Sequence, residues 1–369
     1  RKVVLASILA LAPGASPKAQ DRGPQDPARS QQAAKRPAAT IVREFRNTHL
    51  PGRSNDNSPE AIQEFRDAIA QACQRQADLA LELYRSWPDH AEVPEMLNKR
   101  WAGMNNALGK ASAVFAETLK VMKKETNPAI LRQAVLAATR SALLLDEVST
   151  KAKIEIAETA CEIAPDDERG PLALVNIAKY HASDVAQMRK LCNRVLEDWG
   201  KTRWAGAAAR GVQKQLQHIG QTPRFTATDI VSQKPIDTHS WLGHPWVLML
   251  WGGFYGNTSK ALEQIKAHRA RHPLHVLGLY TWQYKGGPTK LRTDLATHHY
   301  DWPQLYTYEP GSSPWKGEWG TGETPLFFLI DAHGKVVALS YRFKNIERAL
   351  RGLEGKGKRT GAVKKRRRV

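Results

Sequence analysis

The chain has 369 residues, of which 41% are hydrophobic and 25% are charged. No apolar run approaches the ~20 residues that a membrane-spanning helix needs, so we expect any membrane contact to be peripheral. Lysine and arginine (55) outnumber aspartate and glutamate (36), and the net charge of +19 favours anionic partners. This length is sufficient for two domains, each with its own core.

The N-terminal region is not expected to contribute to a folded core. Residues 1–20 begin with two cations, continue with a short apolar stretch and then become rich in Ala, Gly, Ser and Pro, as in a secretory signal peptide. Residues 21–57 are rich in Pro, Ala, Arg, Gln and Asn and predict a disordered linker. We therefore expect an exported protein of the periplasm or cell envelope, with order beginning near Ser58.

Residues 58–220 predict an all-α domain. Ser58 followed by Pro59 is a strong helix start, because it places a capping hydroxyl before a proline at the first helical position. Apolar residues then recur at spacings of three and four, and Pro or Gly residues divide the region into short helical segments. The spacing of these segments is solenoid-like, but no clean 34-residue repeat is present. We therefore predict a solenoid-like helical array without assigning a repeat family, and its default role is binding.

The cysteines all fall in this helical region, at Cys73, Cys161 and Cys192. They lie on the apolar faces of predicted helices, where a cysteine acts as a small buried hydrophobic residue. A Cys161–Cys192 disulfide between neighbouring helices is the alternative in an oxidising compartment. The chain contains no Cys-x-x-Cys sequence.

Residues 224–354 predict an α/β domain, separated from the helices by a Gly/Pro boundary near residues 220–223. The uninterrupted apolar run 246–251 predicts a buried central strand, and residues 258–265 continue at helical spacing after a glycine-bearing turn. Alternating strands and helices that end in a β-hairpin are typical of this class. Further strands are expected near residues 225, 275–282, 305–308, 326–330 and 336–341, with helices near 238–242, 288–299 and 345–353.

Two motifs in this domain, Phe254–Thr258 after the central strand and Thr324-Pro325 before the β-hairpin, resemble the thioredoxin-like TlpA/ResA (redoxin, AhpC/TSA) family. The segment Phe254–Thr258 follows the strand where the family carries Trp-Cys-x-x-Cys, with Tyr255 and Thr258 at the two cysteine positions. The more specific motif is Thr324-Pro325, followed by a strand, an Asp-x-x-Gly hairpin and another strand. The resemblance covers residues 225–353. It implies a thioredoxin-like fold in which Pro325 is cis and faces the turn.

The family's thiol–disulfide chemistry needs an attacking and a resolving thiol, and Tyr255 and Thr258 supply neither. The leading hypothesis is therefore an exported thioredoxin-fold protein that has lost its redox cysteines and binds a protein or peptide non-catalytically. The first alternative is the family's thiol–disulfide oxidoreductase or antioxidant activity, using a thiol from elsewhere. The expected peptide-binding residues are Phe254, Tyr255, Thr258, Thr324 and Pro325, with Trp315 and Trp319 as an exposed aromatic rim.

A second alternative comes from the basic tail, residues 355–369, which holds eight cations and no anion and is expected to be disordered. It predicts an envelope scaffold that binds anionic polymers or a lipid surface. His268 and His272 are spaced i, i+4, and His298-His299 follow, but no cysteine or carboxylate completes a compact ligand set. We therefore expect no metal site and no cofactor.

Overall fold

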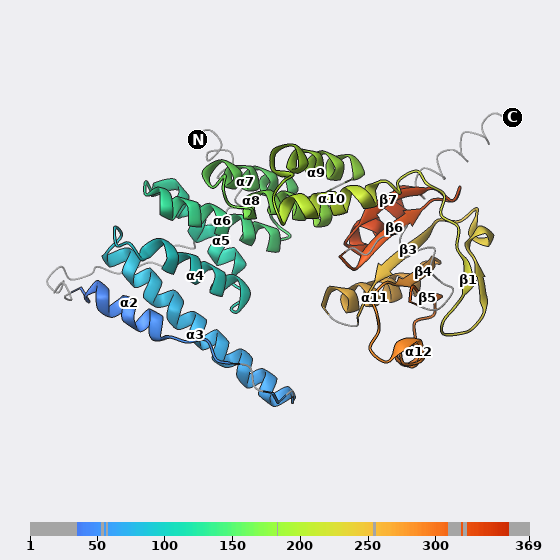
Figure 1. Ribbon diagram of the computed structural model, residues 1–369, viewed down its shortest axis with the longest axis horizontal. Helices are drawn as coiled ribbons and strands as arrows, with labels where there is room; N and C mark the ends of the chain where they lie inside the picture. Colours follow the sequence, from blue (N-terminus) through green and yellow to red (C-terminus); the bar gives the residue numbers. More distant parts are fainter. Residues whose placement is uncertain are drawn as a thin grey trace, which may run out of the picture. The chain divides into compact units, whose positions relative to one another are not determined.

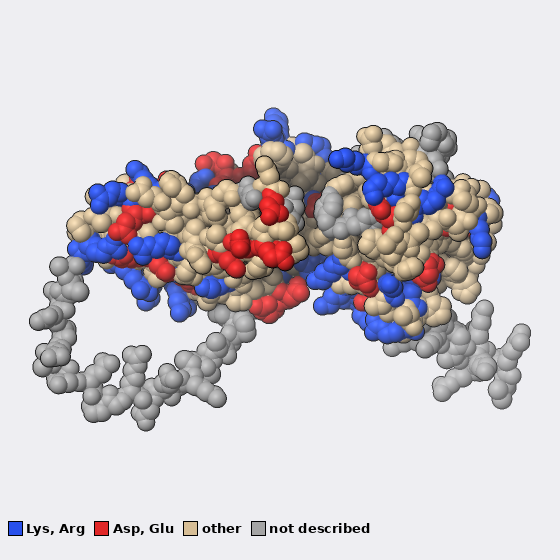
Figure 2. Space-filling model, turned by 90° about the horizontal axis from the view of Figure 1, so that it is seen from below, with Lys and Arg blue, Asp and Glu red and all other residues tan. Residues whose placement is uncertain are grey.

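The computed structural model describes residues 35–52, 55–56, 58–182, 184–253, 256–308, 319 and 323–353 (Figure 1). The chain divides into two compact units, Arg1–Leu174 and Val175–Val369. The expected signal peptide, the basic tail and, within the expected linker, residues 21–34, 53–54 and 57 lie outside the described residues. Figure 2 shows lysines and arginines spread over the surfaces of both units, with acidic side chains between them.

The first unit is an array of α-helices, as the sequence predicts. Consecutive helices pack against each other around one continuous core that includes Leu83, Leu97, Trp101 and Ile130. The helices are α2 (Ala38–Asn47), α3 (Pro59–Ser86), α4 (Val93–Asn106), α5 (Ala111–Lys124), α6 (Pro128–Leu144) and α7 (Thr150–Ile163), followed by α8 (Arg169–Tyr180), which crosses into the second unit.

Short polar side chains begin several of these helices. The Ser58 hydroxyl accepts a hydrogen bond from the Ala61 amide at 3.2 Å, which confirms the predicted start of α3. Asn127 caps α6 in the same way, by accepting from the Ala129 amide at 2.9 Å. Each cap satisfies one of the amides that a helix N-terminus leaves without an intrahelical partner.

Helix α2 corrects the prediction that residues 21–57 form a disordered linker. Residues 38–47 are helical and bury Ile41, Val42 and Phe45 against α3. Glu44 adds ion pairs with Arg36 and Arg75. The apolar stripe occupies little more than one helical turn, so it does not stand out from the surrounding Pro- and Ala-rich sequence. Packing against α3 supplies the stability that so short a helix lacks alone.

A buried ion pair connects α3, α4 and α5. Arg100 is 7% exposed, donates to the Ala77 carbonyl at 2.6 Å, and holds both oxygens of Glu117 at 3.0 and 2.7 Å. The Trp101 indole also donates to Glu117, at 2.9 Å. Burial raises the pKa of the Glu117 carboxyl, but the hydrogen bonds from Arg100 and Trp101 outweigh it, and the pKa lies below its usual value.

We expect Arg100→Met to lower the free energy of unfolding by about 3 kcal/mol at neutral pH, because it leaves a largely buried carboxylate without its cation. A lowered folded-state pKa gives stability that is present above the unfolded pKa of about 4.3 and is lost as the pH falls through the folded value. The variant should therefore lose less stability than the parent on acidification below pH 4. Urea unfolding followed by helical circular dichroism measures both effects.

The matched control is Lys151→Met. Lys151 pairs with Glu155 at 3.9 Å, and the Lys151 side chain is 82% exposed. That change should cost less than about 0.5 kcal/mol. Equal losses in the two variants would show that the buried pair does not hold the three helices together.

The second unit contains the end of α8, helices α9 and α10, a small hairpin and a mixed α/β region (Figure 1). Its helices are α9 (Val185–Trp199), α10 (Ala205–Leu216), η1 (Thr238–Trp241), α11 (Gly256–Arg269) and α12 (Gly287–Thr297), and residues 343–353 are also helical. Its strands are β1 (Thr226–Thr228), β2 (Pro235–Asp237), β3 (Trp246–Trp251), β4 (His275–Tyr280), β5 (Gln304–Tyr306), β6 (Leu326–Ile330) and β7 (Val336–Ser340).

Among the described residues, the main sheet has the strand order β5-β4-β3-β6-β7. Strand β3 is parallel to β4 and antiparallel to β6, and all six of its residues are buried, as expected for the central strand. The register pairs Trp251 with Tyr280, Tyr280 with Tyr306, and Leu250 with Leu326. The ends of β3, β4 and β5 and the beginning of β6 therefore lie together, and we call this the carboxyl end of the sheet.

Helices α9 and α10 fall in the same unit as the sheet, whereas the sequence places residues up to 220 in the helical domain. The backbone after α10 explains their association with the sheet. The Gly220 amide donates to the Val336 carbonyl at 2.8 Å, and the Val336 amide donates to the Gln221 carbonyl at 2.9 Å. These bonds attach the end of the helical region to the first residue of β7.

Candidate functional site

A row of aromatic rings crosses the carboxyl end of the sheet. Trp251, Tyr280 and Tyr306 end three neighbouring parallel strands. The ring centroids of Trp251 and Tyr280 are 4.8 Å apart, and those of Tyr280 and Tyr306 are 5.8 Å apart. Tyr284 and Tyr308 extend the row, at 5.6 Å from Tyr280 and 5.8 Å from Tyr306. These five residues are the aromatic row, and strand register brings Trp251, Tyr280 and Tyr306 together.

Side chains from β4 and the residues after it hold the turn that follows β3. The Gly253 amide donates to the Tyr280 hydroxyl at 3.1 Å. The Trp282 indole lies directly over Gly252, where an added Cβ would come within 2.3–2.6 Å of the ring. Trp282 is nevertheless 41% exposed. The turn therefore presents an exposed indole that is fixed on one face by the backbone beneath it.

The turn leads into α11, whose first turn contains Thr258, a buried residue at one of the family's cysteine positions. Phe254, Tyr255 and Trp315 lie outside the described residues. The expected proximity of Thr324-Pro325 to Tyr255 remains a prediction. Because Thr258 is 3% exposed, its side chain contributes little to the surface at this turn.

The Thr324-Pro325 peptide bond is cis, as the resemblance implies. It directly precedes β6, whose first residue, Leu326, pairs with Leu250 near the end of β3. The proline loop and the turn after β3 therefore leave the sheet at the same end. A parallel β3–β4 pair, an antiparallel β6–β7 hairpin, a helix after the central strand and a cis Thr-Pro before β6 define the architecture. The second unit has a thioredoxin-like fold.

The search against protein-family models found no match, and no curated protein matches the chain. Solved structures do match its thioredoxin-like part. One is a thiol-disulfide oxidoreductase from Bacteroides fragilis, with 14% identity over 36% of this chain and 98% of that one, at a TM-score of 0.30. A thiol:disulfide interchange protein from Chlorobium tepidum has 14% identity over 37% of this chain and 96% of that one, at a TM-score of 0.29. A pneumococcal exposed lipoprotein thioredoxin from Streptococcus pneumoniae has 18% identity over 36% of this chain and 100% of that one, at a TM-score of 0.31.

An ion-pair cluster that the sequence did not predict holds the other side of the proline loop. The Glu323 carboxylate accepts from the Lys179 ammonium at 2.5 Å and from the Tyr180 hydroxyl. Lys179 is 8% exposed and also lies 5.6 Å from the centre of the Tyr341 ring. Burial raises the pKa of Tyr180 and of Tyr341, which keeps both phenols protonated at neutral pH. The end of α8 therefore fixes the residue before Thr324.

Trp319 corrects the prediction of an exposed aromatic rim. Its side chain is 4% exposed and stacks on His218, with ring centroids 4.2 Å apart. Phe328 and Phe225 surround it at 5.1 and 5.8 Å. His218 follows α10 and is about 100 residues before Trp319 in the sequence. Part of the pocket that buries this tryptophan therefore comes from a distant segment of the chain. The exposed tryptophan at this end of the sheet is Trp282 instead.

The cysteines are buried, as predicted, and none of the three forms a disulfide in the structure. The alternative Cys161–Cys192 bridge would join the two units and stays a prediction. Cys192 is the one cysteine in the second unit and is 0% exposed. Burial raises its pKa to about 12, and the charge of Lys179 offsets this only in part. Its thiol is therefore a weak source of thiolate.

The histidines do not form a metal centre among the described residues. No cluster of three or more His, Cys, Asp or Glu side chains there is close enough to hold a metal ion. His268 lies with its Nδ1 2.9 Å from a Glu347 carboxylate oxygen, so a carboxylate from the closing helix already engages it.

Among the described residues, no helix has the length and apolar character that crossing a bilayer requires.

We expect Gly252→Ala to lower the free energy of unfolding by about 2 kcal/mol, because the new methyl group must displace the Trp282 indole. The double variant with Gly252→Ala and Trp282→Ala should lose less free energy of unfolding than the two single variants lose in total. The difference should be at least about 1 kcal/mol. Chemical denaturation of the four proteins in this cycle measures the coupling.

Gly211→Ala is the control, because Gly211 lies within α10 with nothing within 4 Å of the added methyl. It should stabilise the chain by up to about 1 kcal/mol. Purely additive losses for Gly252→Ala and Trp282→Ala would contradict the packing of the indole on this glycine.

Proposed function

We propose that the second unit binds an extended protein or peptide segment at the carboxyl end of its sheet, without thiol–disulfide chemistry of its own. The observation that carries this proposal is the exposed Trp282 indole, fixed over Gly252 beside the aromatic row. Partly exposed indoles on a rigid support are frequent energetic centres of protein interfaces. The neighbouring Thr324-Pro325 loop adds backbone groups beside the first residue of β6.

Redox catalysis by this unit is disfavoured by the state of its thiol. The turn holds Thr258 where the family has a cysteine, and Cys192 is fully buried. A thiol with a pKa of about 12 has only about one thiolate in 10⁵ molecules at pH 7, and the thiolate is the nucleophile. The oxidoreductase alternative therefore requires a thiol from a partner or a rearrangement that exposes Cys192.

Two further expectations depend on residues outside the described ones. Export to the periplasm or cell envelope depends on residues 1–20, and contact with anionic polymers or lipid depends on residues 355–369. Both remain predictions. Neither is needed for binding at the carboxyl end of the sheet.

The unmodified chain should show no reduction of insulin above background, whereas Tyr255→Cys with Thr258→Cys should form a reversible disulfide. The reason is that the first turn of α11 retains the partial positive charge that lowers the pKa of a thiol from its reference value of about 8.5. Thiol titration before and after mild oxidation measures the disulfide, and Thr258→Cys alone is the control. Insulin reduction by the unmodified chain would establish the oxidoreductase alternative.

Peptides selected from a displayed random library on the unmodified chain should bind at least about tenfold more weakly to Trp282→Ala, as expected for an interface tryptophan. Trp87→Ala is a matched control, since Trp87 is 40% exposed and Trp282 is 41% exposed. Trp87 lies in the first unit and should leave the affinity within about twofold. Fluorescence polarisation with labelled peptides gives the affinities. Equal effects of the two changes would place binding elsewhere on the chain.

A further inference from the structure

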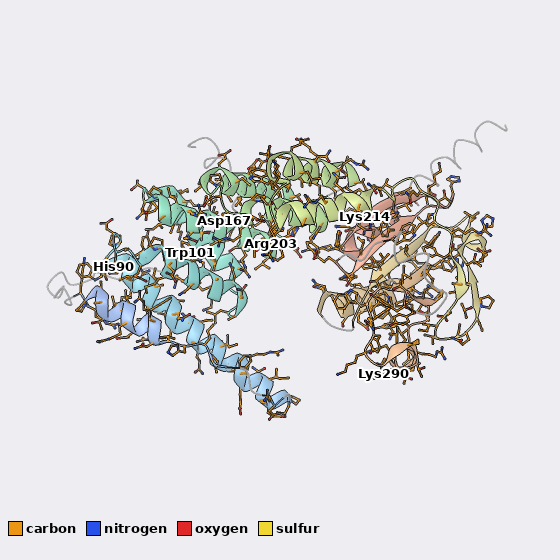
Figure 3. All side chains as sticks on the ribbon, in the orientation of Figure 1. His90, Trp101, Asp167, Arg203, Lys214 and Lys290 are labelled. Carbon is orange, nitrogen blue, oxygen red and sulfur yellow. The ribbon has the colours of Figure 1, made fainter. Side chains whose placement is uncertain are left out.

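A cavity of about 570 Å³ lies beside the aromatic row. Residues 283–285 line it after β4, Tyr306 and Tyr308 line it at the end of β5 and just beyond, and residues 286–288 line it at the start of α12. Figure 3 labels Lys290 on the same helix, α12. The cavity therefore lies at the carboxyl end of the sheet.

The cavity wall is held in place by hydrogen bonds within the protein. Tyr306 is 3% exposed, and its hydroxyl accepts from the Tyr284 amide at 3.1 Å. The Tyr284 hydroxyl in turn donates to Asp294, and the Lys290 ammonium lies 3.1 Å from the same carboxylate. Two tyrosine rings are thus fixed before a ligand arrives, which reduces the ordering cost of binding.

The charge of the wall has one sign. Lys285 is exposed and, among the described residues that line the cavity, is the only charged side chain. The nearby carboxylate of Asp294 is engaged by Lys290 and by the Tyr284 hydroxyl, so it does not offset Lys285. The described lining therefore combines tyrosine rings, a proline and the carboxamide of Gln283 with one positive charge.

We propose that this cavity takes an acidic side chain, Asp or Glu, together with an adjacent apolar residue of the peptide bound beside Trp282. The inference rests on the proposed function, because it assigns a specificity to the same binding surface. The carboxylate pairs with Lys285, and the apolar neighbour packs on Tyr308 and Pro288. Trp282 and Tyr284 are two residues apart, and an extended peptide advances about 3.3 Å per residue, so a few residues reach both.

The test compares peptide selections on three proteins: the unmodified chain, Lys285→Glu and Lys335→Glu. Lys335 is a matched control because it is exposed in the turn between β6 and β7, at the opposite end of the sheet. We expect Asp or Glu to be enriched on the unmodified chain and on Lys335→Glu, and to be lost on Lys285→Glu. Circular dichroism checks that each variant is folded.

A double-mutant cycle tests the contact directly. An enriched peptide and its Glu→Gln version are titrated against the unmodified chain and against Lys285→Met. We expect the peptide change to weaken binding about five- to tenfold on the unmodified chain and to have less than a twofold effect on Lys285→Met. Tyr308→Ala should weaken both peptides, since it removes the apolar wall.

The outcomes separate this inference from the proposed function. If peptides bind and Trp282→Ala weakens them while Lys285→Glu behaves like Lys335→Glu, the acidic specificity is wrong and the proposed function stands. If no library peptide binds above background, the proposed function fails and the inference fails with it. If inorganic phosphate displaces the peptide and binds equally well to Tyr308→Ala, the cavity is a site for small anions and the inference is overturned.

Discussion

The pairing of β3 with β4 on one side and with β6 on the other is the constraint on which the candidate site depends. Because β3 is buried along its whole length, its register with both neighbours is strongly specified, and a slip of one residue would place its side chains on the opposite face. That register aligns Trp251 with Tyr280 and Leu250 with Leu326. The aromatic row and the cis-proline loop thus meet at one end of the sheet.

Different forces fix the two sides of that end. On the β6–β7 side, α8 supplies the ammonium of Lys179 and the hydroxyl of Tyr180 to Glu323, in surroundings where Lys179 is almost fully buried. On the β4–β5 side, tyrosine rings and their hydroxyls bond the Gly253 and Tyr284 amides. The turn after β3 and the proline loop are therefore held by side chains from other elements. These two segments need little regular structure of their own.

Sequence pattern predicted the parts of the fold that depend on local signals. The uninterrupted apolar run 246–251 identified the central strand, and the hairpin pattern located β6–β7, whereas the cis bond at Pro325 was implied by the resemblance to a family. Contacts between distant residues left no such signal. Glu323 and Lys179 are 144 positions apart, and nothing near either residue indicates the other. The burial of Trp319 by His218 was missed for the same reason, whereas α2 was missed because its apolar stripe is short.

The exposed indole of Trp282 shows how the site combines rigidity with accessibility. A glycine at 252 lets the ring lie close over the turn, and the Trp282 side chain is still 41% exposed. A ring held this way loses little side-chain freedom on binding, and that freedom is a main cost of forming an interface. Catalysis by a thioredoxin turn depends on a thiolate, whereas binding depends on a fixed and accessible surface. The described residues at this end supply such a surface, and the thiol of this unit is buried.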